Sequence, residues 1–221
     1  MKKERQVLVI FPHPDDEAYG VSGTIAMHVA NNTPVAYACL TLGEMGRNLG
    51  NPPFTTREHL PSIRKRELEE AAKIMGISDL RMLGYRDKTI EFENQPKLIA
   101  HLHSIIEEIN PSLIITFYPG YSVHPDHDAT GAAVIEAVKL IPEKNRPTVH
   151  CVAFSHNCEA YIGEPDIVYN IESVSTIKFE SIKAHSSQSQ ASIAAMQEAY
   201  LKKDPKAIAR FSYERFWTYP L

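Results

Sequence analysis

Residues 6–17 read QVLVIFPHPDDE, and this stretch predicts both the type of fold and the position of a polar site. The apolar run 6–11 is short and continuous and is ended by Pro12, which is typical of a parallel strand buried on both faces. Residues 17–31 then predict a helix. Because a buried strand leads directly into a helix, we expect the chain to begin an α/β fold.

The alternation of strands and helices continues along the first two thirds of the chain. Further strands are expected at 35–40, 79–83, 113–117, 148–154 and 167–169, and further helices at 62–75, 96–109, 127–140, 174–185 and 189–202. Ser62 is expected to cap the helix 62–75, and Gly76 is expected to end it. The aromatic tail FSYERFWTYPL (211–221) is expected to pack on the body of the protein.

This pattern predicts a single α/β domain (1–221), built on a Rossmann-like, mostly parallel sheet with helices on both faces. A chain of 221 residues is long enough for one sizeable core, and no linker or internal repeat divides it. The stretch 43–61 carries glycine, asparagine and three prolines and is expected to be a long loop. Long loops in compact domains usually serve a function.

Net charge, the length of the apolar runs and the number of cysteines limit which partners and which cellular locations are expected. The net charge of -4 offers no basic face for nucleic acid. The apolar run 6–11 is too short for a signal peptide, and no run approaches the length that spans a bilayer. The three cysteines, Cys39, Cys151 and Cys158, are too few for a disulfide framework and fit a reducing compartment. We therefore expect a cytoplasmic protein that binds neither nucleic acid nor membranes.

Two clusters of histidine and aspartate follow two of the expected strands. PHPDDE (12–17) follows the first strand, and HPDH (124–127) follows the strand 113–117. A lone histidine before proline is more often a loop residue than a ligand, and adjacent acids are ordinary where a helix begins. Here, however, the carboxyl ends of parallel strands open at one edge of the sheet, so the two clusters should meet there.

The residue types in these clusters predict a catalytic metal site. Catalytic zinc takes about three protein ligands and leaves one position open for water. His13 and Asp16 can face one point, and a histidine of the second cluster would complete the set. The residues alone leave open which of His124 and His127 binds metal and which does acid or electrostatic work. Asp15 is free to act as the base, and ferrous iron or manganese are alternatives to zinc.

These motifs resemble the PIG-L/LmbE family of zinc N-deacetylases, over nearly the whole chain. Besides the two clusters, four segments are similar to family motifs: TLGEMG (41–46), the helix from Arg64 and Glu67 to AAKIMG (71–76), LGYRD (83–87) and AHSSQ (184–188). Lys88 departs from the pattern, since the family often has a small residue there. The resemblance implies a Rossmann-like fold and hydrolysis of an N-acetyl amine.

The resemblance also implies roles for individual residues. Its zinc ligands here are His13, Asp16 and His127. Asp15 would be the general base, and His124 the protonated partner that stabilises the oxyanion and helps the amine leave. Asp126 would orient His124 and keep it protonated to higher pH. With this acid and base, a bell-shaped pH profile is expected.

Substrate contacts are expected from four residues: Arg47, Arg64, Asp87 and His185. Arg47 is a candidate because it lies in the long loop 43–61, and the other three are taken from the family motifs. The nearest likeness is to the enzymes of bacillithiol synthesis, which implies N-acetylglucosaminyl malate as the amino-sugar substrate. The family likeness also implies a homo-oligomer, either a trimer or a hexamer.

Other functions remain as alternatives at this level. The same residues would serve an amidase that acts on bacillithiol S-conjugates or a deacetylase of another amino sugar. A non-catalytic metal-binding module is more remote. A nucleotide-binding oxidoreductase is disfavoured because the first strand is followed by PHPDDE and not by G-x-G-x-x-G.

Overall fold

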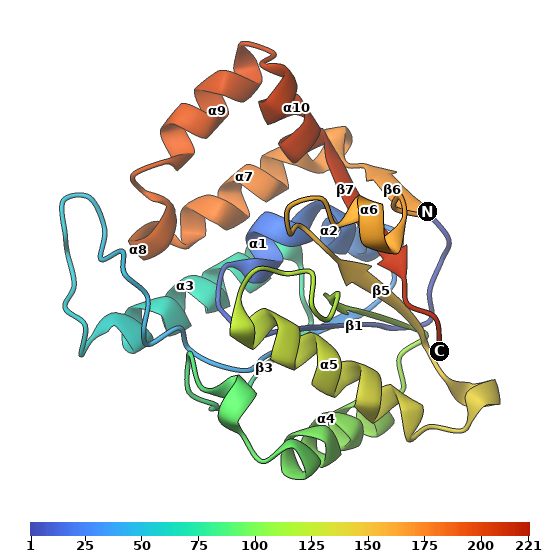
Figure 1. The fold of residues 1–221 in the computed structure, drawn as a ribbon. Helices are drawn as coiled ribbons and strands as arrows, with labels where there is room; N and C mark the ends of the chain where they lie inside the picture. The colour runs from blue at the N-terminus through green and yellow to red at the C-terminus, as the bar shows by residue number, and fades with distance from the viewer.

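The computed structural model describes residues 1–221 and contains one seven-stranded sheet with the strand order β3-β2-β1-β4-β5-β7-β6 (Figure 1). The strands are β1 (Val7–Phe11), β2 (Val35–Cys39), β3 (Asp79–Met82), β4 (Leu113–Phe117), β5 (Thr148–Val152), β6 (Ile167–Asn170) and β7 (Tyr213–Thr218). The first five strands pair in parallel, and β7 runs antiparallel to both β5 and β6. The predicted α/β fold with a mostly parallel sheet is confirmed.

Helices cover both faces of the sheet (Figure 1). They are α1 (Asp16–Gly20), α2 (Ser22–Ala30), α3 (Leu60–Met75), α4 (Gln95–Ile109), α5 (Pro125–Lys139), α6 (Glu159–Ile162), α7 (Ser175–Ala184), α8 (Ser186–Ser189), α9 (Ile193–Leu201) and α10 (Pro205–Ser212). None of the helices combines the length and the apolar character needed to cross a bilayer.

The side chains of β1 alternate between two hydrophobic cores. Leu8 and Ile10 pack in the core that α4 and α5 cover, whereas Val7, Val9 and Phe11 pack in the core that α2 and α3 cover. This is the period of two expected of a strand, and all five residues are fully buried. A strand buried on both faces explains why the sequence shows a continuous apolar run.

The chain departs from the sequence prediction in two helices. The expected helix 17–31 is two helices, α1 and α2, which meet at Val21. The helix α3 begins at Leu60, so the prediction that Ser62 caps it is wrong. Pro61 stands at the start of this helix, where its fixed φ and missing N–H suit the first turn. Gly76 ends the helix with φ 77°, as predicted.

The aromatic tail does more than pack on the body. Residues 213–218 form β7, which joins the sheet between β5 and β6, and α10 precedes it. Phe216 is fully buried in the core on the α2 and α3 side. Neither α10 nor β7 was predicted, because the sequence pattern showed only an aromatic segment without its partner strands.

The strand order places a binding site at the centre of the sheet. From β1 the chain moves outward to β2 and β3, and from β4 it moves in the opposite direction to β5. Such a reversal leaves a crevice beyond the carboxyl ends of the two central strands. The loop after β1 (12–15) and the loop after β4 (118–124) both begin at this crevice.

Candidate metal centre and active site

Three side chains from the two loops bring their donor atoms together. His13 Nδ1 lies 3.2 Å from His127 Nε2 and 3.4 Å from Asp16 Oδ2. His127 Nε2 lies 3.3 Å from Asp16 Oδ1. Zinc bonds of 2.0–2.2 Å in a tetrahedral site place neighbouring ligand atoms about 3.3–3.6 Å apart. Asp16 meets the two histidines through different oxygens, so the triangle of His13, Asp16 and His127 is one of side chains whose contacts have the spacing of zinc ligands.

The other ring nitrogen of each of these histidines faces an acceptor. His13 Nε2 lies 3.2 Å from Asp87 Oδ1 and 3.2 Å from Asp126 Oδ2. His127 Nδ1 lies 3.0 Å from the carbonyl oxygen of Ser122. Metal-binding histidines commonly donate their second ring N–H to a carboxylate or a carbonyl in this way. These contacts favour His13 Nδ1 and His127 Nε2 as the donors to a metal.

Two other groupings of donor atoms occur in the same cluster, and we favour neither as the ligand set. His13 also groups with His124 and His127, and separately with Asp87 and Asp126. The two carboxylates, however, contact the Nε2 side of the His13 ring, and His124 already uses its Nδ1 as an acceptor for the backbone N–H of Asp126 at 3.1 Å.

Carboxylate charge exceeds basic charge around His13. Burial by itself would lower the pKa of His13, but hydrogen bonds to Asp126, Asp16 and Asp87 outweigh it and hold that pKa well above its ordinary value. Burial likewise opposes ionisation of Asp16, yet His127 and His13 keep its pKa well below the usual range. A cluster that draws protons onto its histidine is short of positive charge, and a divalent cation would supply it.

Asp15 stands beside this triangle in a strained turn. Its backbone has φ 109°, a conformation that non-glycine residues rarely adopt, and its N–H donates to Glu17 Oε2 at 3.1 Å. Its carboxylate accepts a hydrogen bond from Arg64 Nη2 at 3.0 Å. Burial raises the pKa of Asp15 to about 6, and the opposite charge of Arg64 limits the rise. A carboxylate with a pKa near neutrality suits a general base.

Arg64 supports Asp15 and also lines the cavity described below, so its expected substrate contact stays a prediction. Arg64 is 4% exposed, and its guanidinium also donates to the carbonyl oxygens of Pro14 and Gly43. Gly43 has φ 63°, and a Cβ added there would collide with the guanidinium. Gly43, the first glycine of the TLGEMG segment, is thus required where the chain passes over Arg64.

Asp87 is buried beside His13 and also lines the cavity described below, so its expected substrate contact stays a prediction. Its Oδ1 contacts His13, and its Oδ2 accepts the backbone N–H of Met45 at 2.8 Å. Both acceptor oxygens are therefore occupied by protein donors. Its role in the structure is to orient His13.

The expected contact between the Asp126 carboxylate and His124 is also wrong. That carboxylate accepts backbone N–H groups from Lys88 (2.6 Å) and Ile90 (3.2 Å) and reaches His13. His124 instead caps α5, because its Nδ1 accepts the Asp126 N–H. Burial and the nearby rings of His13 and His127 lower the pKa of His124, so the expected protonation to higher pH is not supported.

His185 does not reach the cavity, which corrects its expected substrate contact. It is fully buried, and its Nε2 lies 2.6 Å from Glu17 Oε1. Glu17 Oε2 accepts both the hydroxyl of Tyr37 (3.0 Å) and the N–H of Asp15. Glu17 was missed by sequence reasoning, although its place in the PHPDDE motif was the available signal.

The centre opens into a polar cavity of about 470 Å³. Its lining includes the three donor residues together with Asp15, Arg64, Asp87, His124, Arg47, Lys88, Gln188, Gly46 and Met45. Arg47 therefore lies where a substrate contact was expected. Lys88 and Gln188 were not predicted as lining residues, although both lie in or beside family motifs. A cavity with a single hydrophobic residue in its wall suits a hydroxyl-rich ligand such as a sugar.

Comparison with known proteins places the chain among deacetylases. Residues 8–138 match the family PIG-L, described as GlcNAc-PI de-N-acetylase. A Bacillus anthracis protein named "Probable N-acetyl-alpha-D-glucosaminyl L-malate deacetylase 2" is 51% identical over 220 residues, which cover 100% of this chain and 97% of that protein. A Bacillus subtilis protein of the same name is 49% identical, over 98% of each chain.

Solved structures share the fold. The N,N'-diacetylchitobiose deacetylase of Pyrococcus horikoshii superposes with a TM-score of 0.77 at 26% identity, over 98% of this chain and 84% of that chain. The match over residues 8–138 includes β1, β4 and the two loops that carry the candidate metal ligands. On this evidence the chain belongs to the PIG-L family of de-N-acetylases.

Proposed function

We propose that this protein is a zinc-dependent hydrolase that removes the acetyl group of N-acetylglucosaminyl malate in bacillithiol synthesis. The single observation that carries the chemistry is the triangle of His13, Asp16 and His127 with Asp15 beside it. The substrate is supported by the names of the Bacillus relatives, which are about half identical over the whole chain.

In this proposal His13, Asp16 and His127 hold the metal, and Asp87 and Asp126 orient His13. A divalent cation there supplies Lewis acidity, which lowers the pKa of water and polarises the acetamide carbonyl. The donor set of two histidines and one carboxylate suits zinc, and ferrous iron or manganese would accept the same ligands.

Asp15 moves the proton, and His124 stabilises the charge that develops on oxygen. The Asp15 carboxylate takes a proton from the water that adds to the carbonyl carbon. His124 accepts an N–H at Nδ1, so its neutral ring carries hydrogen on Nε2 and donates it as a hydrogen bond to the developing oxyanion. The proton held by Asp15 then passes to the amide nitrogen as the C–N bond breaks, which returns Asp15 to its carboxylate form. The products are acetate and a free amine.

The experiment that tests this function measures release of free amine by metal-stripped protein, with and without added zinc. N-acetylglucosaminyl malate and plain N-acetylglucosamine are compared as substrates. Zinc-restored turnover that favours the malate glycoside is expected. Turnover of the plain sugar alone would keep the chemistry but reject the pathway. Absence of turnover on both, with zinc bound, would reject the proposed function.

The other hydrolase functions use the same residues, so only substrate competition separates them. An amidase of bacillithiol S-conjugates or a deacetylase of another amino sugar would show a higher kcat/KM on its own substrate. A non-catalytic metal-binding module would bind zinc and release no amine from any member of the panel.

We also propose a single domain that forms a homo-oligomer, trimeric or hexameric, in the cytoplasm. Strands from both ends of the chain share one sheet, which supports a single domain. All three cysteines are free thiols, as a reducing compartment requires. Light scattering of the purified protein tests the oligomeric state.

A further inference from the structure

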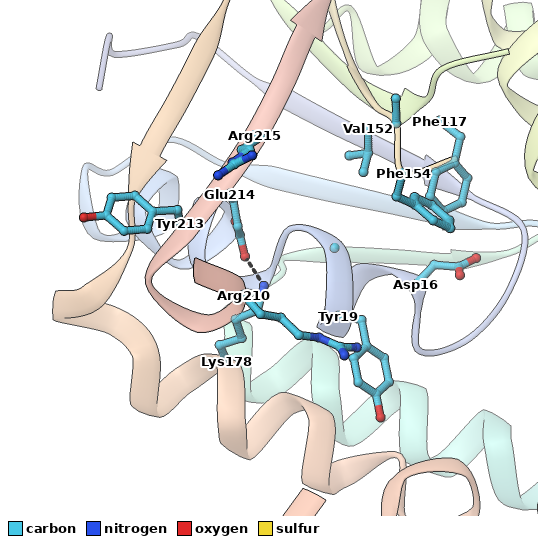
Figure 2. Close-up of a pocket in the computed structure, with 12 residues that line it drawn as sticks. Asp16, Tyr19, Phe117, Val152, Phe154, Lys178, Arg210, Tyr213, Glu214 and Arg215 are labelled. Atoms are coloured by element: carbon cyan, nitrogen blue, oxygen red, sulfur yellow. Dashed lines mark hydrogen bonds and ion pairs between the residues drawn. The ribbon is translucent and has the colours of Figure 1, made fainter. Parts of the chain in front are cut away.

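A second cavity, of about 430 Å³, lies against the metal centre on the side of β7 (Figure 2). Asp16 lines both this cavity and the polar one. The rings of Phe117 and His127 stack with centroids 4.0 Å apart, and Phe154 meets His127 at 5.9 Å. The two cavities therefore adjoin at Asp16, and the rings of Phe117 and Phe154 lie between the second cavity and His127.

Most of the charges in this second cavity are already paired. Lys178 Nζ lies 2.6 Å from Glu214 Oε1, and both side chains are almost completely buried. Glu214 also accepts the backbone N–H groups of Gly23 and Thr24 at the start of α2. The charge of Asp16 is held by His13 and His127, as described above. These pairs leave the two arginines as the uncommitted charges.

Arg210 is the freer of these arginines. It has no carboxylate within ion-pair distance, and its guanidinium lies 5.5 Å from the centroid of the Tyr19 ring, as Figure 2 shows. Arg215 is half exposed and lies 3.7 Å from Glu159, a weak contact. In a chain with a net charge of -4, a free guanidinium stacked on an aromatic ring favours a carboxylate or another planar anion.

We propose that this cavity is an aglycone subsite, in which Arg210 binds a carboxylate carried by the group attached to the sugar. This inference rests on the proposed function, because malate is such a group. The opposite wall contains Phe117, Val152 and Phe154, and six of the twelve lining residues are hydrophobic. An apolar wall facing a guanidinium suits the carbon skeleton of an organic acid better than a bare inorganic anion.

The test compares N-acetylglucosaminyl malate with its dimethyl ester, which lacks the two negative charges and carries two added methyl groups, with zinc-loaded enzyme. Arg210→Gln is expected to lower kcat/KM for the diacid about 10- to 100-fold, mainly through KM. Turnover of the ester should change by less than about threefold, within ordinary surface effects. Arg210→Lys should restore part of the preference, because it returns the charge without the planar fork.

A matched control is Arg66→Gln on α3, since Arg66 is exposed and bonds only the carbonyl oxygen of Ser62. It should leave both substrates unaffected. Should Arg210→Gln fail to fold, Tyr19→Leu removes the stacking platform and is expected to lower the diacid-to-ester ratio. An equal loss on both substrates, or no loss on either, would overturn the subsite.

The failure of the subsite and the failure of the proposed function are distinguishable. If the wild-type enzyme hydrolyses neither substrate, the proposed function fails, and calorimetry of the diacid on wild-type and Arg210→Gln protein decides the subsite. Binding that is lost only in the variant would support it. Binding that is equal in both proteins, or absent from the wild type, would overturn it.

Discussion

The two loops that form the centre are held in place by different means. In the loop after β4 the supporting side chain is local: Asp128 Oδ1 accepts the N–H groups of Gly120 and Ser122, and the Ser122 carbonyl faces His127. Its longer-range partners, at residues 152–155, contribute backbone groups. The loop after β1 depends on residues far away in the sequence. Arg64 holds Asp15 from 49 residues away, and Glu17, which holds the Asp15 N–H, is itself held by His185 from 168 residues away.

This difference indicates which substitutions should disturb Asp15 and which should disturb the histidines of the second loop. A loop whose distant partners are backbone groups keeps those partners when distant side chains are substituted. A strained turn such as that of Asp15 persists only when its surroundings hold it. Substitutions far from the centre should therefore affect the base Asp15 more than the histidines His124 and His127.

The largest effect is expected when each loop loses the side chain that acts on the substrate. Asp15→Asn and His124→Gln should each lower kcat by about 10²- to 10⁴-fold, because the first removes the proton transfer and the second removes the ring N–H that faces the oxyanion. Zinc content measured on the purified variants should remain that of the wild type. Near-normal turnover in either variant would show that its residue, Asp15 or His124, has no part in the mechanism.

The next effect tests the long-range support of the first loop. Arg64→Met should lower kcat about 100-fold at neutral pH, because Asp15 loses the charge that favours its ionised form. The pKa of Asp15 should rise further above about 6, so the acid limb of kcat/KM should move to higher pH. The pH profiles of wild type and variant measure this shift. An unchanged acid limb would mean that Asp15 is not the base.

The acceptors behind His13 are expected to govern metal affinity. Asp87→Asn and Asp126→Asn should each weaken zinc binding about 10- to 100-fold, because each removes a carboxylate that orients the ring. Competition with a chromophoric chelator measures the affinity. His127 offers no matching substitution, since its acceptor is a backbone carbonyl. Unchanged affinity in both variants would contradict the assigned ring orientation.

A smaller effect should appear at the pair of His185 and Glu17. His185→Ala should lower kcat about tenfold with little change in KM, because Glu17 would lose the partner that fixes it against the Asp15 N–H. His185→Gln should restore part of the rate by returning a donor. Tyr37→Phe is the milder control, since Glu17 then loses only one hydrogen bond. A change confined to thermal stability would make the pair merely structural.

The smallest effect is expected from the local support of the second loop. Asp128→Ala should lower the free energy of unfolding by about 1–3 kcal/mol, because it removes an acceptor used by two backbone N–H groups. Its effect on kcat should stay below that of Arg64→Met, although Asp128 is closer to the metal ligands in sequence. Denaturant unfolding and steady-state rates provide the two readings. A larger loss of kcat in Asp128→Ala than in Arg64→Met would contradict the proposed difference between the two loops.

The sequence by itself determined the parallel part of the sheet, most of the helices and the meeting of two motifs. The continuous apolar runs at 7–11 and 113–117 are typical of strands buried on both faces, and the carboxyl ends of parallel strands lie at one edge of a sheet. The meeting of His13 and Asp16 with a histidine of the second cluster was predictable for this reason, whereas the choice of His127 over His124 came from the family resemblance. Arg47 was also predictable as a cavity residue, because the long loop had to lie over this edge.

Only the tertiary structure decided which polar residues face the cavity and which support it. His185 carries the residue type of a binding site but is buried against Glu17, away from the cavity. Arg64 and Asp87 line the cavity and are also bonded to other protein groups. The tail likewise became β7 and, with α10, a wall of the second cavity only because β5 and β6 left a place between them. Burial and hydrogen-bond partners depend on contacts across many residues, which no local pattern contains.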